Sequence, residues 1–342
     1  MRTAVYYNNR DVRLEERPSP RIGSGEARVK VAASGICGSD VLEWYRVKTA
    51  PRVLGHEIAG EIERVGPGVT RFKPGDRVVV SHHVPCNTCR YCLAGHHTVC
   101  ETLHTTNFDP GGFAEFVRVP AINVDRGMFH LPAAVSFEEG TFVEPLGCVV
   151  RGQRHAGLGA GRSLLVLGSG VSGLLHIILA RASGSGRIMA TDVSAYRLDQ
   201  ARRYGADHGF DARADVPAAV RACNDGHGAD LVVVCTGAFS AFQQAMASVD
   251  RAGTVLCFAT TEPGTDLPIP LNEFWRNSVT VTSSYAAAPA DLATALELIR
   301  LKRVDVARMI THRLPLAETG EGFRLMAEGG DASLKIVVDP QS

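Results

Sequence analysis

The sequence has no excess of charge of either sign, because 36 lysine and arginine residues balance 36 aspartate and glutamate residues. Balanced charge gives no reason to expect binding to nucleic acid or to an anionic membrane. The chain also lacks an apolar run long enough to span a bilayer, and its N-terminus lacks the apolar core of a signal peptide. No internal repeat or low-complexity tract is present. These absences favour a globular protein in the cytoplasm, with no nucleic-acid or membrane partner.

The length and the cysteine usage narrow the class further. A chain of 342 residues with 45% hydrophobic residues is typical of a globular enzyme of about two domains. Its nine cysteines are an odd number, and four of them crowd between Cys86 and Cys100. In a reducing compartment such clustering indicates a metal site rather than disulfides.

The stretch from Gly161 to Asp192 has the order of features that a dinucleotide site requires. A short apolar run ends at Leu167, and the motif Gly168-x-Gly170-x-x-Gly173 separates it from apolar residues at helical spacing. The glycines allow a tight turn, close approach of a pyrophosphate and close packing of helix on strand. Asp192 ends the next short strand, where a carboxylate would bind the adenosine ribose and repel a 2′-phosphate. The stretch therefore predicts dinucleotide binding with a preference for NAD.

The two halves of the chain differ in their pattern. Before about residue 150, short strand-like runs separated by turns such as Gly66-Pro67-Gly68 indicate a mostly antiparallel β domain. From about 153 to 285, strands and helices alternate, which predicts a doubly wound parallel sheet. After Asp291 we expect two amphipathic helices and a closing strand at 333–338. The fold class is therefore α/β.

Four cysteines form a compact motif, Cys86-x-x-Cys89-x-x-Cys92-x(7)-Cys100. Four thiolates would hold zinc in a closed tetrahedral site that has no position for a substrate, so such an ion would fold a lobe. An iron–sulfur cluster uses similar spacing and remains the alternative. Unligated buried cysteines would be a third explanation.

A second set of possible ligands is spread along the N-terminal half. Cys37 lies in Gly-Ile-Cys-Gly-Ser-Asp, His56 precedes Glu57, and Glu144 precedes a proline. A thiolate, an imidazole and a carboxylate suit a catalytic zinc with one position open. The residue types alone leave a structural role for each of them equally open.

These motifs occur in the same order in a known family. Cys37-Gly-Ser-Asp, Gly-His56-Glu57, the four-cysteine lobe, Gly111-Gly-Phe-Ala-Glu, Glu144-Pro-Leu and the glycine turn resemble the zinc-dependent medium-chain dehydrogenases. The similarity runs from about residue 2 to 339 and is greatest for the polyol branch, which includes sorbitol and L-idonate 5-dehydrogenases and is near L-threonine dehydrogenase. Glu144 favours this branch, because classical alcohol dehydrogenases have a cysteine ligand there.

The resemblance implies a fold and domain limits. It implies a GroES-like β-barrel catalytic domain, residues 1–152 and 287–342, with a structural-zinc lobe at about 84–102. It also implies a Rossmann NAD-binding domain, residues 153–286.

The resemblance implies an activity as well, namely transfer of a hydride from a secondary alcohol of a polyol, sugar acid or cyclitol to NAD, giving the ketone. Two zinc ions per chain are expected, one structural and one catalytic. Cys37 and His56 would bind the catalytic ion together with Glu57 or Glu144, directly or through water. Ser39 would take the proton of the substrate hydroxyl. The implied cofactor-binding residues are Gly168, Gly170, Val171, Ser172, Gly173, Asp192, Arg197, Thr236, Gly237, Ala259 and Ser284.

The sequence departs from the family on the substrate side. Many members have a histidine five positions after the catalytic cysteine, where this chain has Leu42, and the loop from Cys37 to His56 is shorter than in sorbitol dehydrogenase. A reshaped pocket is expected, with contacts or packing from Glu43, Trp44, Tyr45, His104 and Phe108. No catalytic part is expected for His82, His83, His96, His97 and His155.

Two other functions remain open at this stage. One is an L-threonine-like or amino-alcohol dehydrogenase, including aminocyclitol substrates. The other is a non-catalytic nucleotide-binding relative, although such proteins lack this set of ligands. The resemblance also implies a homodimer or homotetramer, and residues 277–284 would form an edge strand of high β propensity that a partner usually covers.

Overall fold

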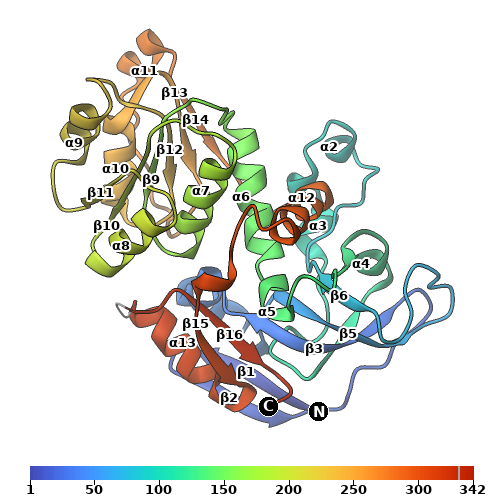
Figure 1. The fold of residues 1–342 in the computed structure, drawn as a ribbon. Helices are drawn as coiled ribbons and strands as arrows, with labels where there is room; N and C mark the ends of the chain where they lie inside the picture. Colours follow the sequence, from blue (N-terminus) through green and yellow to red (C-terminus); the bar gives the residue numbers. More distant parts are fainter. Residues whose placement is uncertain (330–331) are drawn as a thin grey trace. The chain divides into compact units, whose positions relative to one another are not determined.

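The computed structural model describes residues 1–329 and 332–342. By internal contacts the chain divides into two compact units. The first comprises Met1–Gly147 and Ala286–Ser342, and the second comprises Cys148–Tyr285. Helix α6, Val143–His155, begins in the first unit and continues into the second (Figure 1).

The first unit is built from short strands. Its main sheet has the order β15-β16-β3-β5-β6-β8, with β7 also paired to β3, and a smaller sheet has the order β2-β1-β4. All pairs are antiparallel among the described residues except β15 with β16, so the expected mostly antiparallel β domain is confirmed. The strands are β1 Arg2–Asn8, β2 Asp11–Glu16, β3 Ala27–Gly35, β4 Arg52–Val53, β5 Glu57–Val65, β6 Arg77–Val80, β7 Phe116–Val119, β8 Met128–His130, β15 Ile310–Pro315 and β16 Lys335–Asp339.

The helices of the first unit are mostly short. Capping is visible at α5, where Ser136 Oγ accepts from Glu139 N and Glu139 Oε2 accepts from Ser136 N, so two free helix-end donors are satisfied. The helices are α1 Glu43–Arg46, α2 Arg90–Leu93, α3 Glu101–Thr105, α4 Ala121–Arg126, α5 Phe137–Gly140, α12 Pro289–Arg300 and α13 Thr319–Glu328.

Strand and helix alternate through the second unit. The parallel sheet has the order β11-β10-β9-β12-β13-β14, which is the doubly wound order with a topological switch between β9 and β12. The elements are β9 Leu164–Leu167, α7 Val171–Ala182, β10 Ile188–Asp192, α8 Ala195–Arg203, β11 His208–Asp211, α9 Val216–Cys223, β12 Ala229–Val234, α10 Phe239–Ser248, β13 Val249–Cys257, α11 Leu271–Asn277 and β14 Thr280–Ser283.

Burial explains why the strands of the second unit read as continuous apolar runs. All four residues of β9 are fully buried, since helices cover both faces of the sheet (Figure 1). The edge strand expected over 277–284 covers only Thr280–Ser283, because α11 precedes it and Ser278 ends that helix in the left-handed conformation. Strand β14 is the last strand of the sheet order, as expected.

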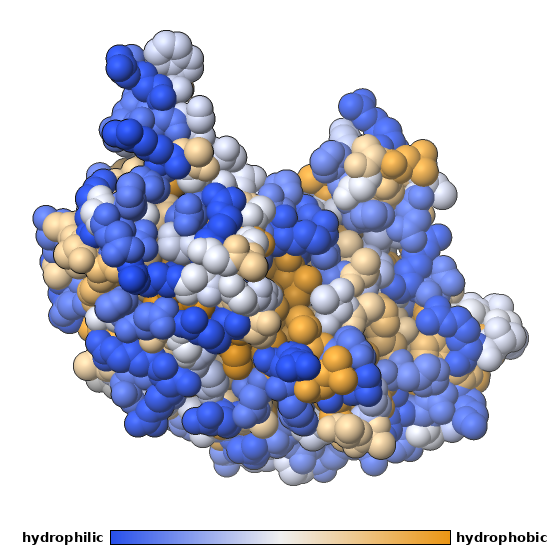
Figure 2. Space-filling view, turned by 45° about the horizontal axis from the view of Figure 1, so that its top comes forward, coloured by the Kyte–Doolittle hydropathy of each residue, from blue (hydrophilic) through white to orange (hydrophobic). Residues whose placement is uncertain are grey.

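The surface is mainly polar in the view of Figure 2, where hydrophilic residues cover most of the face shown and hydrophobic residues lie between them. No helix within the described part of the chain is both long enough and apolar enough to cross a membrane.

Candidate functional site

The backbone register of the first unit brings Cys37, His56 and Glu57 together. Strands β3 and β5 are antiparallel, and Gly35 lies opposite Glu57. The residues that follow β3 therefore lie beside those that begin β5. One ligand atom from each of Cys37, His56 and Glu57 lies within 4.8 Å of the others. Sulfur, nitrogen and oxygen donors at such separations suit zinc, which binds them at about 2.0–2.3 Å.

Asp40 orients the imidazole of His56. Its side chain is fully buried, Oδ1 is 3.4 Å from His56 Nδ1, and Oδ2 accepts a hydrogen bond from Cys37 N at 3.1 Å. Burial works against the charge of both groups. Even so, the neighbouring imidazole lowers the pKa of Asp40, and the Asp40 carboxylate, together with the nearby Cys37 side chain, raises the pKa of His56 well above its usual value. A carboxylate behind the histidine fixes its tautomer, so the other ring nitrogen is available to a metal.

Glu57 has a second, buried partner. Lys335 of β16 donates to its Oε2, and both side chains are only 1% exposed. A Cβ on Gly35 would meet that oxygen and the end of the Lys335 side chain, so a larger residue there would displace this pair. The ion pair offsets the cost of burying the Glu57 carboxylate.

Glu144 also belongs to the first unit. It is in the first turn of α6 and lines a small cavity of about 10 Å³ with Ser81 and Thr141. Its carboxylate is not part of the Cys37, His56 and Glu57 group. The converging group therefore includes Glu57 and not Glu144.

Two residues near this group have no role predicted from the sequence, because no catalytic part was expected for His82 and Arg46 was not singled out. The ring of His82 lies 4.8 Å from that of His56 between centroids, and its buried Nδ1 has no hydrogen-bond partner. Arg46 of α1 donates through Nε to Ser39 O and through Nη2 to Ser39 Oγ, both at 2.9 Å. Burial, with the charges of His83, His56 and Arg46, lowers the pKa of His82 well below its usual value, so its ring is neutral. The only sequence signal for either residue was its closeness to a motif.

The residues expected to reshape the substrate pocket have mixed positions. Phe108 is 2% exposed within the core of the first unit, with its ring edge-on to His82. His104 Nε2 bonds to Thr98 O at 2.8 Å, and the exposed Glu43 accepts from Asn9 N. Trp44 is half-buried and Tyr45 is exposed. Phe108 therefore contributes packing, which the sequence had left open.

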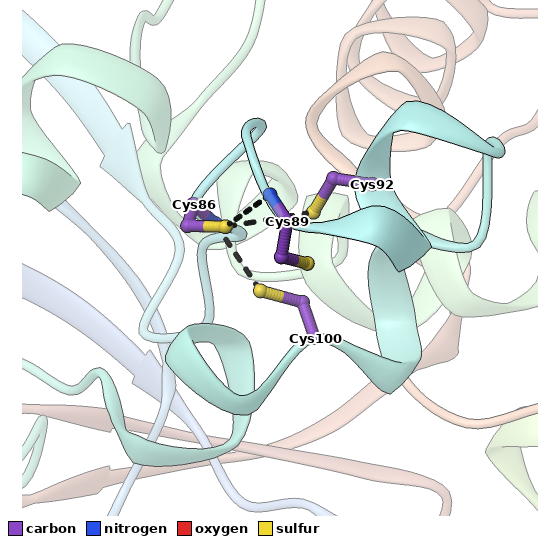
Figure 3. A group of neighbouring side chains, drawn as sticks. All are labelled: Cys86, Cys89, Cys92 and Cys100. Atoms are coloured by element: carbon purple, nitrogen blue, oxygen red, sulfur yellow. Dashed lines mark hydrogen bonds between the residues drawn. The ribbon is translucent and has the colours of Figure 1, made fainter.

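The four lobe cysteines converge. Cys86, Cys89, Cys92 and Cys100 place their sulfur atoms within 4.8 Å of one another, and their side chains gather around one point in Figure 3. Hydrogen bonds from Thr88 and from Cys89 N lower the pKa of Cys86 to about 5, which favours the thiolate that a metal requires. The associated core is small, comprising these cysteines, Leu103 and Ala286. A lobe with so few apolar contacts needs a bound ion for stability.

The glycine turn of the second unit has the geometry that its spacing predicted. Gly168 has φ of +95°, and a Cβ on Gly173 would lie 2.0 Å from Gly168 O, whereas a Cβ on Gly170 would enter open space. Each glycine thus has a separate purpose. Gly168 allows the turn, Gly173 allows α7 to pack on β9, and Gly170 leaves the backbone accessible to a ligand. Asp192 follows at the end of β10, where its oxygens accept from Ser169 N and Ser194 N.

The remaining predicted cofactor residues lie at the same edge of the sheet. Thr236 and Gly237 follow β12, Ala259 follows β13 and Ser284 follows β14. In a parallel sheet these are all carboxyl ends, where ligands bind. Two atoms on this side are buried without a hydrogen-bond partner, Arg197 Nε and Ser284 Oγ. Orphaned donors of this kind fit a polar ligand such as a dinucleotide.

Known proteins resemble the chain in both parts. The family model described as "Alcohol dehydrogenase GroES-like domain" matches residues 23–129, and the one described as "Zinc-binding dehydrogenase" matches 172–300. Sorbitol dehydrogenase of Gallus gallus is 31% identical over 98% of this chain and 96% of its own length.

Among solved structures, alcohol dehydrogenase TADH from Thermus sp. ATN1 has a TM-score of 0.89 at 30% identity and covers 99% of both chains. Galactitol-1-phosphate dehydrogenase from Escherichia coli has a TM-score of 0.88 at 27% identity, covering 99% of this chain and 100% of its own.

The chain belongs to the zinc-dependent medium-chain dehydrogenases. The resemblance inferred from the motifs is thereby confirmed, including its polyol branch, and the fold is a GroES-like domain combined with a Rossmann-type parallel sheet. As a member of this zinc dehydrogenase family the protein is an oxidoreductase, and the match supports zinc and NAD as its cofactors. The role of each site residue is a separate question.

Proposed function

We propose that the protein oxidises a secondary hydroxyl of a polyol-type substrate to the ketone, with NAD as the hydride acceptor. The observation that carries the proposal is the convergence of Cys37, His56 and Glu57 in the first unit. Their ligand atoms match a zinc site with a position open for a hydroxyl group. The relatives named for sorbitol and galactitol 1-phosphate support substrates with several hydroxyl groups.

Within this proposal, Cys37, His56 and Glu57 hold the catalytic zinc. Glu57 uses one oxygen for Lys335, so the other is available to the ion directly or through water. Glu144 lies outside the group and would act, if at all, through water. Zinc bound there would supply Lewis acidity that makes the substrate hydroxyl easier to deprotonate.

Ser39 receives the hydroxyl proton in this proposal. Its Oγ already accepts a hydrogen bond from Arg46 Nη2 at 2.9 Å, which fixes the position of the oxygen and leaves its own hydrogen free to turn. The proton then passes to solvent. NAD held by the second unit would supply the hydride acceptor, so the carbinol carbon would lose its hydrogen with both bonding electrons and its C–O bond would become a carbonyl.

The Rossmann-type unit would bind the dinucleotide along the carboxyl ends of its strands. The N–H groups of Val171 and Ser172 begin α7, and they would face the pyrophosphate beside Gly170. Asp192 would accept from the adenosine ribose with the lone pairs that its two backbone bonds leave free. The nearby Arg197, Thr236, Gly237, Ala259 and Ser284 would complete the cofactor contacts.

The lobe cysteines, Cys86, Cys89, Cys92 and Cys100, would hold a second and purely structural zinc. Its site has four thiolates and so no free position for a substrate.

We also propose a homodimer or homotetramer that uses the free edge of β14. Val281 on this strand is 36% exposed, and an open edge of this kind is usually covered by a partner. Light scattering that finds only a 36.6 kDa particle would contradict this.

One experiment tests the enzymatic proposal. We expect two zinc ions per chain by metal analysis and NADH formation with at least one sugar alcohol, sugar acid or cyclitol. The variant Cys37→Ser should lose one zinc and the activity but keep the ion of the lobe. A well-folded wild-type protein with one zinc or none would refute the proposal. Asp192→Ala should raise the ratio of NADP to NAD use, because the carboxylate no longer repels a 2′-phosphate.

A further inference from the structure

Arg46 places a positive charge beside the proposed proton acceptor. Besides its bonds to Ser39, its Nη2 lies 3.4 Å from Asp40 Oδ1, and its side chain is only 15% exposed. Its charge also contributes to the low pKa values of His82 and His83, so the guanidinium lies among the groups around His56. Across residues 1–329 and 332–342 no acceptor meets its Nη1, which leaves two N–H donors unused.

Arg52 adds a second guanidinium to the same region. Thr49 holds Arg52 near the end of α1, since its Oγ1 donates to the backbone carbonyl of Arg46 at 3.2 Å and accepts from Arg52 Nη1 at 3.4 Å. Burial and the charge of Arg46 lower the pKa of Arg52, whereas Tyr45 and Asp40 act to raise it. In the described part of the chain Arg52 has no carboxylate in ion-pair contact.

The carboxylates nearby do not balance these charges. Asp40 is shared between Arg46 and His56, and Glu43 is an exposed side chain that accepts from Asn9 N. One partly buried positive charge, on Arg52, is therefore left without a counterion. Arginine is well suited to bind carboxylate and phosphate oxygens through paired N–H donors.

We propose that the physiological substrate is an anion, a polyhydroxy compound whose carboxylate or phosphate binds Arg52 and the free Nη1 of Arg46 while its hydroxyl lies beside Ser39. This deepens the proposed function and depends on it. Between the two oxyanions the structure favours a single-charge carboxylate, because one unpaired cation is available, which points to a sugar acid rather than a neutral polyol.

The test compares matched acid and polyol pairs that differ in one terminal group. The pairs are D-gluconate with D-sorbitol, D-galactonate with galactitol and D-mannonate with D-mannitol, and D-sorbitol 6-phosphate tests the phosphate source. For each compound kcat/KM is measured on the zinc-loaded enzyme with NAD. Binding is measured separately by calorimetry in the presence of NADH, which gives a readout that needs no turnover.

We expect at least one acid to exceed its matched polyol in kcat/KM and in affinity, and this preference should weaken at high salt. In Arg52→Gln the ratio of acid to polyol should fall about 10- to 100-fold, as expected for loss of a charged hydrogen bond. Arg52→Lys should restore part of the ratio, because it keeps the charge. Arg21→Gln, an exposed arginine of the same unit, is the matched control and should leave the ratio unchanged.

The outcomes separate the two proposals. The proposal of an anionic substrate is refuted if neutral polyols are oxidised and bound as well as every acid. It is also refuted if Arg52→Gln lowers kcat/KM equally for acids and polyols. The proposed dehydrogenase activity is unaffected by either result. A preference for D-sorbitol 6-phosphate over the acids would confirm that the substrate is an anion, but would refute the proposal that its anionic group is a carboxylate. Absence of zinc at Cys37 and His56 would refute the proposed function itself.

Discussion

The buried pair of Glu57 and Lys335 gives a quantitative prediction for Lys335→Met. Both side chains are 1% exposed, so the substitution leaves a carboxylate buried without its ammonium partner. Removal of one member of a buried ion pair costs about 3–5 kcal/mol in the free energy of unfolding. We expect a loss of this size in zinc-free protein.

The loss should be smaller when the catalytic zinc is bound. The ion lies next to Glu57 in our proposal, and its charge would take over from the missing ammonium. By thermodynamic linkage, the variant should then bind that zinc more tightly than the wild type does. The gain in binding free energy should equal the difference between the stability losses measured without and with zinc. The ion pair thus affects both the folding of the first unit and its affinity for metal.

The assay is urea unfolding followed by tryptophan fluorescence. The chain has two tryptophans, and the background variant Trp275→Phe leaves Trp44 as a reporter in the first unit. Lys302→Met is the control, since its pair with Glu139 is half exposed on the lysine side. Solvent screening should hold its effect to about 1 kcal/mol or less.

Two results would refute this reasoning. One is a loss below about 1 kcal/mol for Lys335→Met, which would mean that solvent reaches Glu57. The other is an equal loss with and without zinc, which would mean that Glu57 does not face the ion. The double variant Glu57→Gln with Lys335→Met should recover part of the stability, because no unpaired charge remains.

Three further predictions follow from the site geometry. Cys92→Ser should lower the zinc content by one ion and make the lobe sensitive to proteolysis, and unchanged zinc would contradict a metal role for the cysteines. Gly173→Ala should abolish NADH binding in a fluorescence titration while zinc content stays normal, because its Cβ would lie 2.0 Å from Gly168 O. Because its pKa is raised, the metal-free His56 ring holds its proton to higher pH than a free imidazole does, and zinc must displace that proton. Zinc affinity at the catalytic site should therefore fall by up to about tenfold for each unit of pH below that pKa, measured by competition with a chelator. Asp40→Asn should flatten this dependence, and an unchanged slope would contradict the assigned cause.

The sequence determined the features that depend on residues close together in the chain. The turn between β9 and α7 is set by three glycines within six residues, and the four-cysteine lobe closes over fifteen residues. In both cases short-range spacing and backbone freedom decide the geometry. The alternation of strands and helices in the second unit was likewise readable, because each buried strand is a separate apolar run.

Tertiary structure decided what depends on distant parts of the chain. Lys335 meets Glu57 across 278 positions, and only the pairing of β16 with β3 and of β3 with β5 brings them together. The same pairing brings Glu57 beside Cys37. The positions of Arg46 and His82 beside Ser39 and His56 also depend on packing, since neither residue belongs to a motif. The spacing of two residues in the sequence predicts their contact only when few residues separate them. The contacts named here join distant segments, and the pairing of strands across the whole sheet brings those segments together.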